Sequence, residues 1–234
     1  MKKLSIILFA LLTTSCSELQ TIAAQTLEQP QQVTNMQIRK GLKQALQKGI
    51  DKQVSKLTAK DGFYTNDKVK ILLPEELKKV DSGLRKIGMA DLADEGLKLM
   101  NRAAEDAVKK ATPIFINAIK NMDVAGAKQI LLGDDRSATD FLESKTSAKL
   151  YTEFFPVVNQ SFKDVGADKL WTTAINKYNK IPFQQNVDPD LSKYVTNQAL
   201  NGVFTMIAIE EKKIRKNFSS RSTDLLKRVF QLQD

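Results

Sequence analysis

The side chains that could perform acid–base chemistry in this chain are carboxylates, lysines and tyrosines, because the sequence contains no histidine. This composition excludes Ser-His-Asp and Cys-His nucleophile systems and histidine-ligated metals. Glu105, Glu210 and Glu211 are the carboxylates we would assign to a glycan-cleaving reaction, which needs two carboxyl groups about 5–9.5 Å apart. The sequence also has no phosphate-binding glycine loop and no calcium loop. We therefore expect no metal and no cofactor, and we assign no catalytic residue.

Several other polar residues lie beside the predicted hydrophobic core. Asn101 and Glu105 are four residues apart and share a helix face, with Arg102 next to them. A buried charge is costly unless it is paired, so we expect these three residues to join a polar network with Arg215 or Arg221. Glu211 and Arg215 are themselves spaced as a helical ion pair. The network either braces neighbouring helices or lines a pocket for a small anionic or polyol ligand.

Four lysines recur every four residues along the first predicted helix. They are Lys48, Lys52, Lys56 and Lys60, and the whole segment 36–60 holds seven cationic side chains against the single acid Asp51. The lysines face away from the apolar positions of the same helix, because an α-helix turns by about 100° per residue. This face either contacts anionic lipid headgroups or is simply solvated.

Cys16 is the only cysteine of the chain, and it follows an arrangement typical of an export signal. Lys2 and Lys3 are followed by the apolar run Leu4–Leu12, which is shorter than the ~17–25 residues that cross a bilayer. The small polar residues before Cys16 resemble a bacterial lipobox, although Thr13 stands where that motif usually has leucine. We therefore expect cleavage before Cys16 and its acylation, because two or more acyl chains hold a protein stably at a membrane.

The residues after Cys16 favour an outer-membrane location. Ser17 stands where aspartate would retain an enteric lipoprotein at the inner membrane. We expect a signal peptide at 1–15, a flexible tether at 16–35 and a single helical domain at 36–234. Removing residues 1–15 lowers the formal net charge from +9 by only two. An exported protein of this moderate charge is not expected to bind nucleic acid.

The rest of the chain is predicted to be helical nearly throughout. Apolar residues at helical spacing predict an all-α fold, a single compact domain of about eight helices around a buried central helix. That central helix starts at Asp188-Pro189 and contains Gly202–Ile209, which is apolar on all sides. The expected helices are 33–57, 75–87 after Pro74, 90–122 with a kink at Pro113, 123–133 capped by Asp123, 138–145, 148–165, 168–180, 188–216 and 223–230 capped by Ser222.

Several short strings between about Ile38 and Phe230 are specific in combination. They include Gly41-Leu42-Lys43-Gln44-Ala45-Leu46, Asp61-Gly62-Phe63, Ile71-Leu72-Leu73-Pro74, Met100-Asn101-Arg102-Ala103-Ala104-Glu105, Pro113-Ile114-Phe115, Ala199-Leu200-Asn201-Gly202-Val203-Phe204, Glu210-Glu211, Ile214-Arg215 and Arg221-Ser222-Thr223-Asp224. Together these strings resemble the domain of unknown function 4197 family of exported bacterial proteins. The resemblance implies a helical, often lipid-anchored domain and no activity.

Three functions remain open from the sequence. The first is a non-enzymatic envelope lipoprotein that binds an envelope protein or lipid, or has a structural role, at the periplasmic face of the outer membrane. The second is a carrier of a lipid or apolar ligand, which predicts an internal cavity of several hundred Å³. The third is a carboxylate-dependent enzyme acting on peptidoglycan. A dense core, an apolar tunnel and a carboxylate pair in a groove would distinguish the three.

Overall fold

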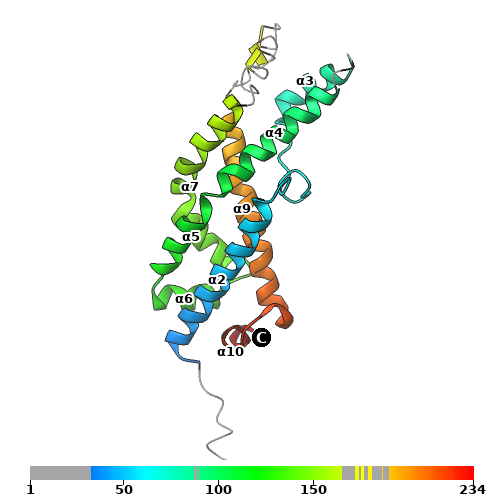
Figure 1. The fold of residues 1–234 in the computed structure, drawn as a ribbon. Coiled ribbons are helices and arrows are strands. Elements are labelled where there is room, and N and C mark those ends of the chain that lie inside the picture. The colour runs from blue at the N-terminus through cyan, green and yellow to red at the C-terminus, as the bar shows by residue number, and fades with distance from the viewer. Residues whose placement is uncertain are drawn as a thin grey trace, which may run out of the picture. The chain divides into compact units, whose positions relative to one another are not determined.

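The computed structural model of this chain describes residues 33–86, 88, 90–164, 172–173, 175–176, 179–180, 186 and 190–234. Every regular element among these residues is a helix, which confirms the all-α class, and Asn35–Asp234 form one compact unit (Figure 1). The elements are α2 (Asn35–Leu57), α3 (Glu75–Lys86), α4 (Ala90–Val108), α5 (Ala111–Lys120), α6 (Val124–Leu131), α7 (Ser137–Asp164), α9 (Leu191–Lys216), η1 (Phe218–Ser220), α10 (Asp224–Phe230) and η2 (Gln231–Gln233).

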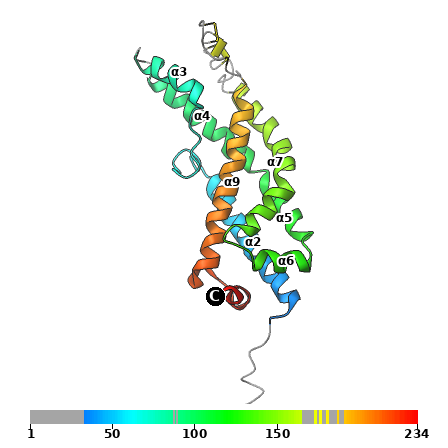
Figure 2. The ribbon, with the colours of Figure 1, turned by 180° about the vertical axis from the view of Figure 1, so that it is seen from behind.

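The predicted buried central helix is confirmed as α9. It packs against α2, α4 and α7, as the two opposite views show (Figures 1 and 2). Within the run Gly202–Ile209, Val203 and Ile207 are buried, and the ring of Phe204 meets that of Phe115 edge to face at 5.8 Å. Because several helices cover it, α9 needs apolar residues on most of its circumference.

The segment after α2 is held against α9 by an aromatic side chain. Phe63 is fully buried, and a methyl group at position 202 would lie 2.7 Å from its Cε1 atom. Gly202 therefore lets the ring of Phe63 approach the backbone of α9 more closely than any other residue would. This contact connects the turn after α2 to the centre of the core.

The predicted kink at Pro113 is wrong, because the chain breaks earlier. α4 ends at Val108 and α5 begins at Ala111, which makes Pro113 the third residue of a new helix. Proline is tolerated in the first turn, where the backbone N–H groups have no partner within the helix. The single helix expected over 90–122 is therefore two.

The opposite error applies to α7. Segments 138–145 and 148–165 were expected to be separate helices, but Ser137–Asp164 is one helix that contains Pro156. Leu150, Phe154 and Val158 are completely buried at successive four-residue steps across the proline. The burial of this stripe on both sides offsets the backbone hydrogen bond that proline removes.

Two helix starts also differ from the predicted positions. α9 begins at Leu191 with Asp190 as its cap, later than the predicted start, while Asp188 lies outside the described residues. α10 is capped by Thr223, whose hydroxyl accepts a hydrogen bond from the Leu226 N–H, and not by Ser222. The predicted Asp123 cap of α6 is confirmed. The helix expected over 168–180 lies mostly outside the described residues.

Candidate functional site

The most extensive buried polar cluster of the described residues is built around α9. The carboxylate of Glu211 accepts hydrogen bonds from the N–H groups of Ala138 and Thr139, at 2.9 and 2.8 Å, and from the Thr139 hydroxyl at 2.7 Å. Ala138 and Thr139 lie in the first turn of α7, where N–H groups lack helical partners and the helix dipole favours a negative charge. Glu211 therefore completes the N-terminus of α7.

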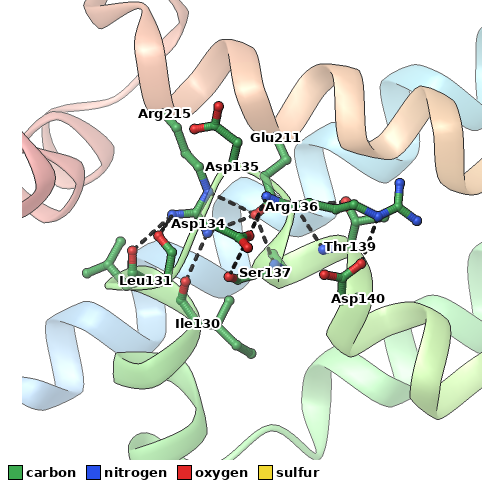
Figure 3. Close-up of polar contacts among 12 residues, drawn as sticks. Ile130, Leu131, Asp134, Asp135, Arg136, Ser137, Thr139, Asp140, Glu211 and Arg215 are labelled. Atoms are coloured by element: carbon green, nitrogen blue, oxygen red, sulfur yellow. Dashed lines mark hydrogen bonds and ion pairs between the residues drawn. The ribbon is translucent and has the colours of Figure 1, made fainter.

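Arg215, one turn further along α9, does the equivalent for α6. Its guanidinium donates to the carbonyls of Ile130 and Leu131, both at 2.9 Å, and to the carboxylate of Glu211 (Figure 3). Carbonyls at a helix C-terminus lack partners and favour a cation. One ion pair on α9 thus binds the end of α6 and the start of α7.

This ion pair is almost completely withdrawn from solvent. The side chains of Glu211 and Arg215 are 6% and 3% exposed, and their closest atoms are 2.8 Å apart. Burying two charges is unfavourable unless further hydrogen bonds satisfy them. Each of these groups has several such bonds, so the pair is suited to fixing helices in place.

Arg221 forms the next layer of the same cluster. It donates to the carbonyls of Ile214 and Arg215, at 3.1 and 2.9 Å, near the end of α9. Its guanidinium also binds both carboxylate oxygens of Asp234, at 2.6 and 2.7 Å. The bond from Arg221 holds the pKa of Asp234 below its usual value, and the same bond raises the pKa of Arg221. Arg221 therefore connects the end of α9 to the last described residue.

A second polar cluster lies on α4. The side chain of Asn101 accepts from the Ile71 N–H at 2.8 Å and donates to the Ile71 carbonyl at 2.9 Å. This two-bond pattern satisfies both backbone groups of Ile71, as a neighbouring strand would. Because Asn101 and Ile71 are both buried, leaving those groups unpaired would be costly.

Glu105 holds the turn that follows α2. Its carboxylate accepts from the N–H groups of Asp61 at 3.2 Å and Phe63 at 3.1 Å. Asp61 adopts a φ of 60°, a left-handed conformation that non-glycine residues rarely adopt. Burial raises the pKa of Glu105, an effect that the two N–H donors partly oppose. Arg102 lies 3.8 Å from the Asp61 carboxylate, so it supports the same turn from the surface.

The structure thus places the predicted network residues in two clusters. Asn101, Arg102 and Glu105 contact the segment 61–71, whereas Glu211, Arg215 and Arg221 contact α6, α7 and the chain end. Gly202, which contacts Phe63, is 13 residues from Arg215 on α9. That spacing corresponds to about 20 Å along the helix axis. Each cluster therefore binds groups in its own part of the fold.

The three candidate catalytic carboxylates point toward different parts of the fold. Glu210 binds Lys52 at 2.5 Å and Gln53 at 2.8 Å, both on α2. Its neighbour Glu211 binds α7 instead, and Glu105 binds the turn after α2. Each carboxylate is therefore hydrogen-bonded to a different part of the chain, whereas paired acid–base catalysis needs two carboxyl groups that face one site.

The predicted lysine face is only partly available. All four lysines are exposed, but Lys48 donates to the Ser222 hydroxyl at 3.0 Å and Lys52 pairs with Glu210. α2 ends at Leu57, so Lys60 lies in the following turn and not on the helix. The face therefore combines two lysines that bind α9 and the segment before α10 with two that extend into solvent.

Two spaces of very different size lie among the described side chains. An apolar cavity between α2, α7, α9 and α10, lined by residues such as Leu46, Ile207 and Phe230, has a volume of ≈ 20 Å³. A polar surface cleft of ≈ 780 Å³ lies beside the cluster of Figure 3 and is lined by residues such as Asp135, Arg136 and Gln233. The core cavity is far below the several hundred Å³ that an apolar carrier would need.

The sequence model of a family described as protein of unknown function (DUF4197) matches residues 32–231. The chain belongs to this family. The DUF4197 match covers the central helix and both polar clusters except Asp234, so these features lie within the family domain. No curated protein and no solved structure matches the chain.

Other features of this DUF4197 chain bear on the predicted site. Over the residues that the structure describes, no group of three or more His, Cys, Asp or Glu side chains is placed to hold a metal ion. No described helix is both long enough and apolar enough to span a membrane. Cys16, the predicted lipid-attachment residue, lies outside the described residues.

Sequence reasoning missed the backbone partners of the buried charges and two cations at the start of α2. Arg39 donates to the Met122 carbonyl at 3.0 Å, and Lys43 donates to the Lys120 carbonyl at 2.7 Å. The Lys43 bond satisfies the C-terminus of α5, and the Arg39 bond satisfies a carbonyl of the short connection between α5 and α6. The many cationic residues in 36–60 indicate that basic side chains line this helix. They do not predict which helix ends those side chains contact.

Proposed function

We propose that this DUF4197 chain is a lipid-anchored protein of the bacterial cell envelope, held through Cys16 at the periplasmic face of the outer membrane. Its helical domain is a non-catalytic binding or structural module. The arrangement of Lys2, Lys3, an apolar run and Cys16 supports the export and the anchor. Ser17 after the cysteine favours the outer membrane.

The observation that carries the non-catalytic assignment is how the buried charges are used. The buried ionisable side chains among the described residues are Glu105, Glu210, Glu211, Arg215 and Arg221. Each is bonded to groups of the same chain. A catalytic group must instead be free to contact a substrate. The ≈ 20 Å³ core cavity likewise favours a binding or structural module over a carrier.

The anchor is tested by replacing Cys16 with serine in the full chain and separating the membranes by density. The native protein is expected in the outer-membrane fraction after processing before Cys16. The Cys16→Ser protein is expected to keep its signal segment and lose the acyl modification, because the sulfur is the acceptor. Ser17→Ala serves as the control, since it leaves the cysteine intact. Identical processing and modification of all three proteins would contradict the proposal.

The absence of catalysis is tested on isolated peptidoglycan. The purified protein is expected to release no soluble glycan fragments above the level of a heat-denatured sample. Release that is lost in Glu105→Gln or Glu210→Gln, with the variant still folded by circular dichroism, would establish the enzyme alternative instead.

A further inference from the structure

The first three turns of α2 present a cationic face with one exposed apolar side chain. Met36, Arg39, Lys40 and Lys43 follow the i, i+3, i+4, i+7 spacing that places residues on one side of a helix. The opposite side of the same turns is buried through Ile38 and Leu42. Met36 is 62% exposed, although methionine is usually buried. The first acidic residue of α2 is Asp51, well beyond these turns.

The C-terminus of α5 adds to this face. Arg39 and Lys43 reach across to the carbonyls of Met122 and Lys120, and the side chain of Lys120 is itself exposed. Burial lowers the pKa of Lys43, and the nearby charge of Arg39 lowers it further. Two cationic side chains therefore lie close together, and the backbone carbonyls that they bind carry no negative charge.

In the described part of the chain, no carboxylate neutralises this group. Among the described residues, no acidic side chain forms an ion pair with Arg39, Lys40, Lys43 or Lys120. Asp123 is three residues after Lys120 in the sequence. Its carboxylate caps α6, because it accepts a hydrogen bond from the Gly126 N–H at 2.6 Å. We call Met36, Arg39, Lys40, Lys43 and Lys120 the α2–α5 basic surface.

We propose that the α2–α5 basic surface binds the anionic headgroups of a lipid bilayer, with Lys40 and Lys120 contacting phosphate groups and Met36 entering the interface. This inference rests on the proposed lipid anchor for its choice of occupant. Each cation near an anionic bilayer increases binding about five-fold, and an apolar side chain beside the cations adds to binding.

The position of the surface along the chain favours a bilayer over other anionic partners. The surface begins at residue 36, and 18 residues separate Cys16 from Asn35. Even a fully extended segment of that length spans at most about 65 Å. An anchor at Cys16 therefore keeps these turns within reach of headgroups at a high effective concentration. Lys48 and Lys52, by contrast, already bind groups of α9 and the segment before α10.

The test uses the full protein isolated from the envelope and reconstituted in vesicles that contain nitroxide-labelled lipid. Because Cys16 is the only native cysteine and is acylated in this proposal, Met36→Cys introduces a single reactive thiol for an environment-sensitive fluorophore. The matched control is Leu72→Cys, a residue of similar exposure (56%) before α3. In vesicles with anionic lipid, we expect the lipid nitroxides to quench the label at 36 several-fold more than the label at 72.

Charge variants separate headgroup binding from mere closeness to the tether. Lys40→Gln with Lys120→Gln is expected to remove the extra quenching at position 36, as are vesicles of neutral lipid. Lys145→Gln with Lys149→Gln, an equal change of charge on exposed residues of α7, is expected to leave it unchanged. Quenching at 36 that is independent of headgroup charge and of Lys40 and Lys120 would overturn the proposal.

The intact mass of the same preparation distinguishes this inference from the proposed function. If the protein carries no acyl chain, the proposed anchor is refuted. Headgroup binding by the basic surface is then measured by co-sedimentation with vesicles. The surface predicts binding to anionic vesicles that falls about 25-fold in the Lys40→Gln, Lys120→Gln protein, because each cation contributes about five-fold. Equal binding of these two proteins, compared without acyl chains, would overturn the inference.

Discussion

At the scale of single residues, this domain uses its buried charges to complete helix ends. Glu211 supplies the carboxylate that the N-terminus of α7 favours, and Arg215 supplies the cation that the C-terminus of α6 favours. Arg221 does the same for the last carbonyls of α9. Side chains distant in the sequence thereby satisfy backbone groups that would otherwise be buried without partners.

Removing one member of the buried ion pair should be strongly destabilising. In Arg215→Met, Glu211 loses its cation, and the carbonyls of Ile130 and Leu131 lose their donors. Breaking a buried pair in this way costs about 3–5 kcal/mol. Urea denaturation followed by circular dichroism would measure the loss.

The control for this variant is Lys213→Met, which removes an exposed cation from the same helix. A surface substitution of this kind should change the free energy of unfolding by less than about 0.5 kcal/mol. Equal stability of Arg215→Met and Lys213→Met would show that the buried pair does not hold α6 and α7 to α9.

Glu105 should make stability depend on pH. Because burial raises its pKa above the ordinary 4.5, the folded protein binds this proton more tightly than the unfolded chain. Its contribution is therefore fully present below the unfolded pKa and is lost as pH rises through the raised folded pKa. The free energy of unfolding of the native protein, relative to Glu105→Gln, should decrease over that range in urea titrations at several pH values. A difference between the two proteins that does not change with pH would refute this assignment.

At the scale of elements, local patterns predicted the helices better than their breaks. The apolar spacing of α2 and the Pro74 start of α3 depend on neighbours in the sequence, and both agree with the structure. The outcome at Pro113 and Pro156 depended on packing instead. Pro113 lies in a first turn, while Pro156 is kept inside α7 by burial of residues on both sides.

Two glycines of α2 should respond in opposite ways to the same substitution. A methyl group at position 41 would lie 2.8 Å from Val229 Cγ2, so Gly41→Ala must displace α10 from α2. Overpacking of this kind costs about 1–3 kcal/mol. At position 49 the nearest atom, Glu210 Cγ, would be 3.6 Å away, an ordinary contact. Gly49→Ala should therefore stabilise the helix by about 0.5–1 kcal/mol.

Thermal and urea denaturation of the two alanine variants would test this prediction. Because both positions are in one helix, each variant serves as the control for the helix propensity of the other. If Gly41→Ala is as stable as Gly49→Ala, α10 does not pack closely on α2 in solution.

At the scale of the whole molecule, the sequence predicted the fold class but not the geometry of the polar clusters. The expected network joined Asn101 and Glu105 to Arg215 or Arg221, because the residues share a polar character and lie beside apolar stripes. Their actual partners include the backbone of Ile71, Phe63 and Ile130. Backbone groups are the same in every sequence, so only the packing of the helices reveals which ones need a partner.

The buried charges of this domain bind the chain itself, which leaves the surface and the anchor to contact other molecules. The described core holds an apolar cavity of only ≈ 20 Å³, and its carboxylates are bonded to the chain itself. What is left to contact other molecules is the exposed surface, including the cationic face at the start of α2.

The central claim is that Cys16 carries the group that holds this protein at the membrane. Intact-mass spectrometry of the native protein extracted from bacterial membranes tests it most directly. We predict a polypeptide that begins at Cys16 and is heavier than residues 16–234 by the mass of its acyl chains. A chain that still carries Met1, or one that begins at Cys16 with no added mass, would contradict this account.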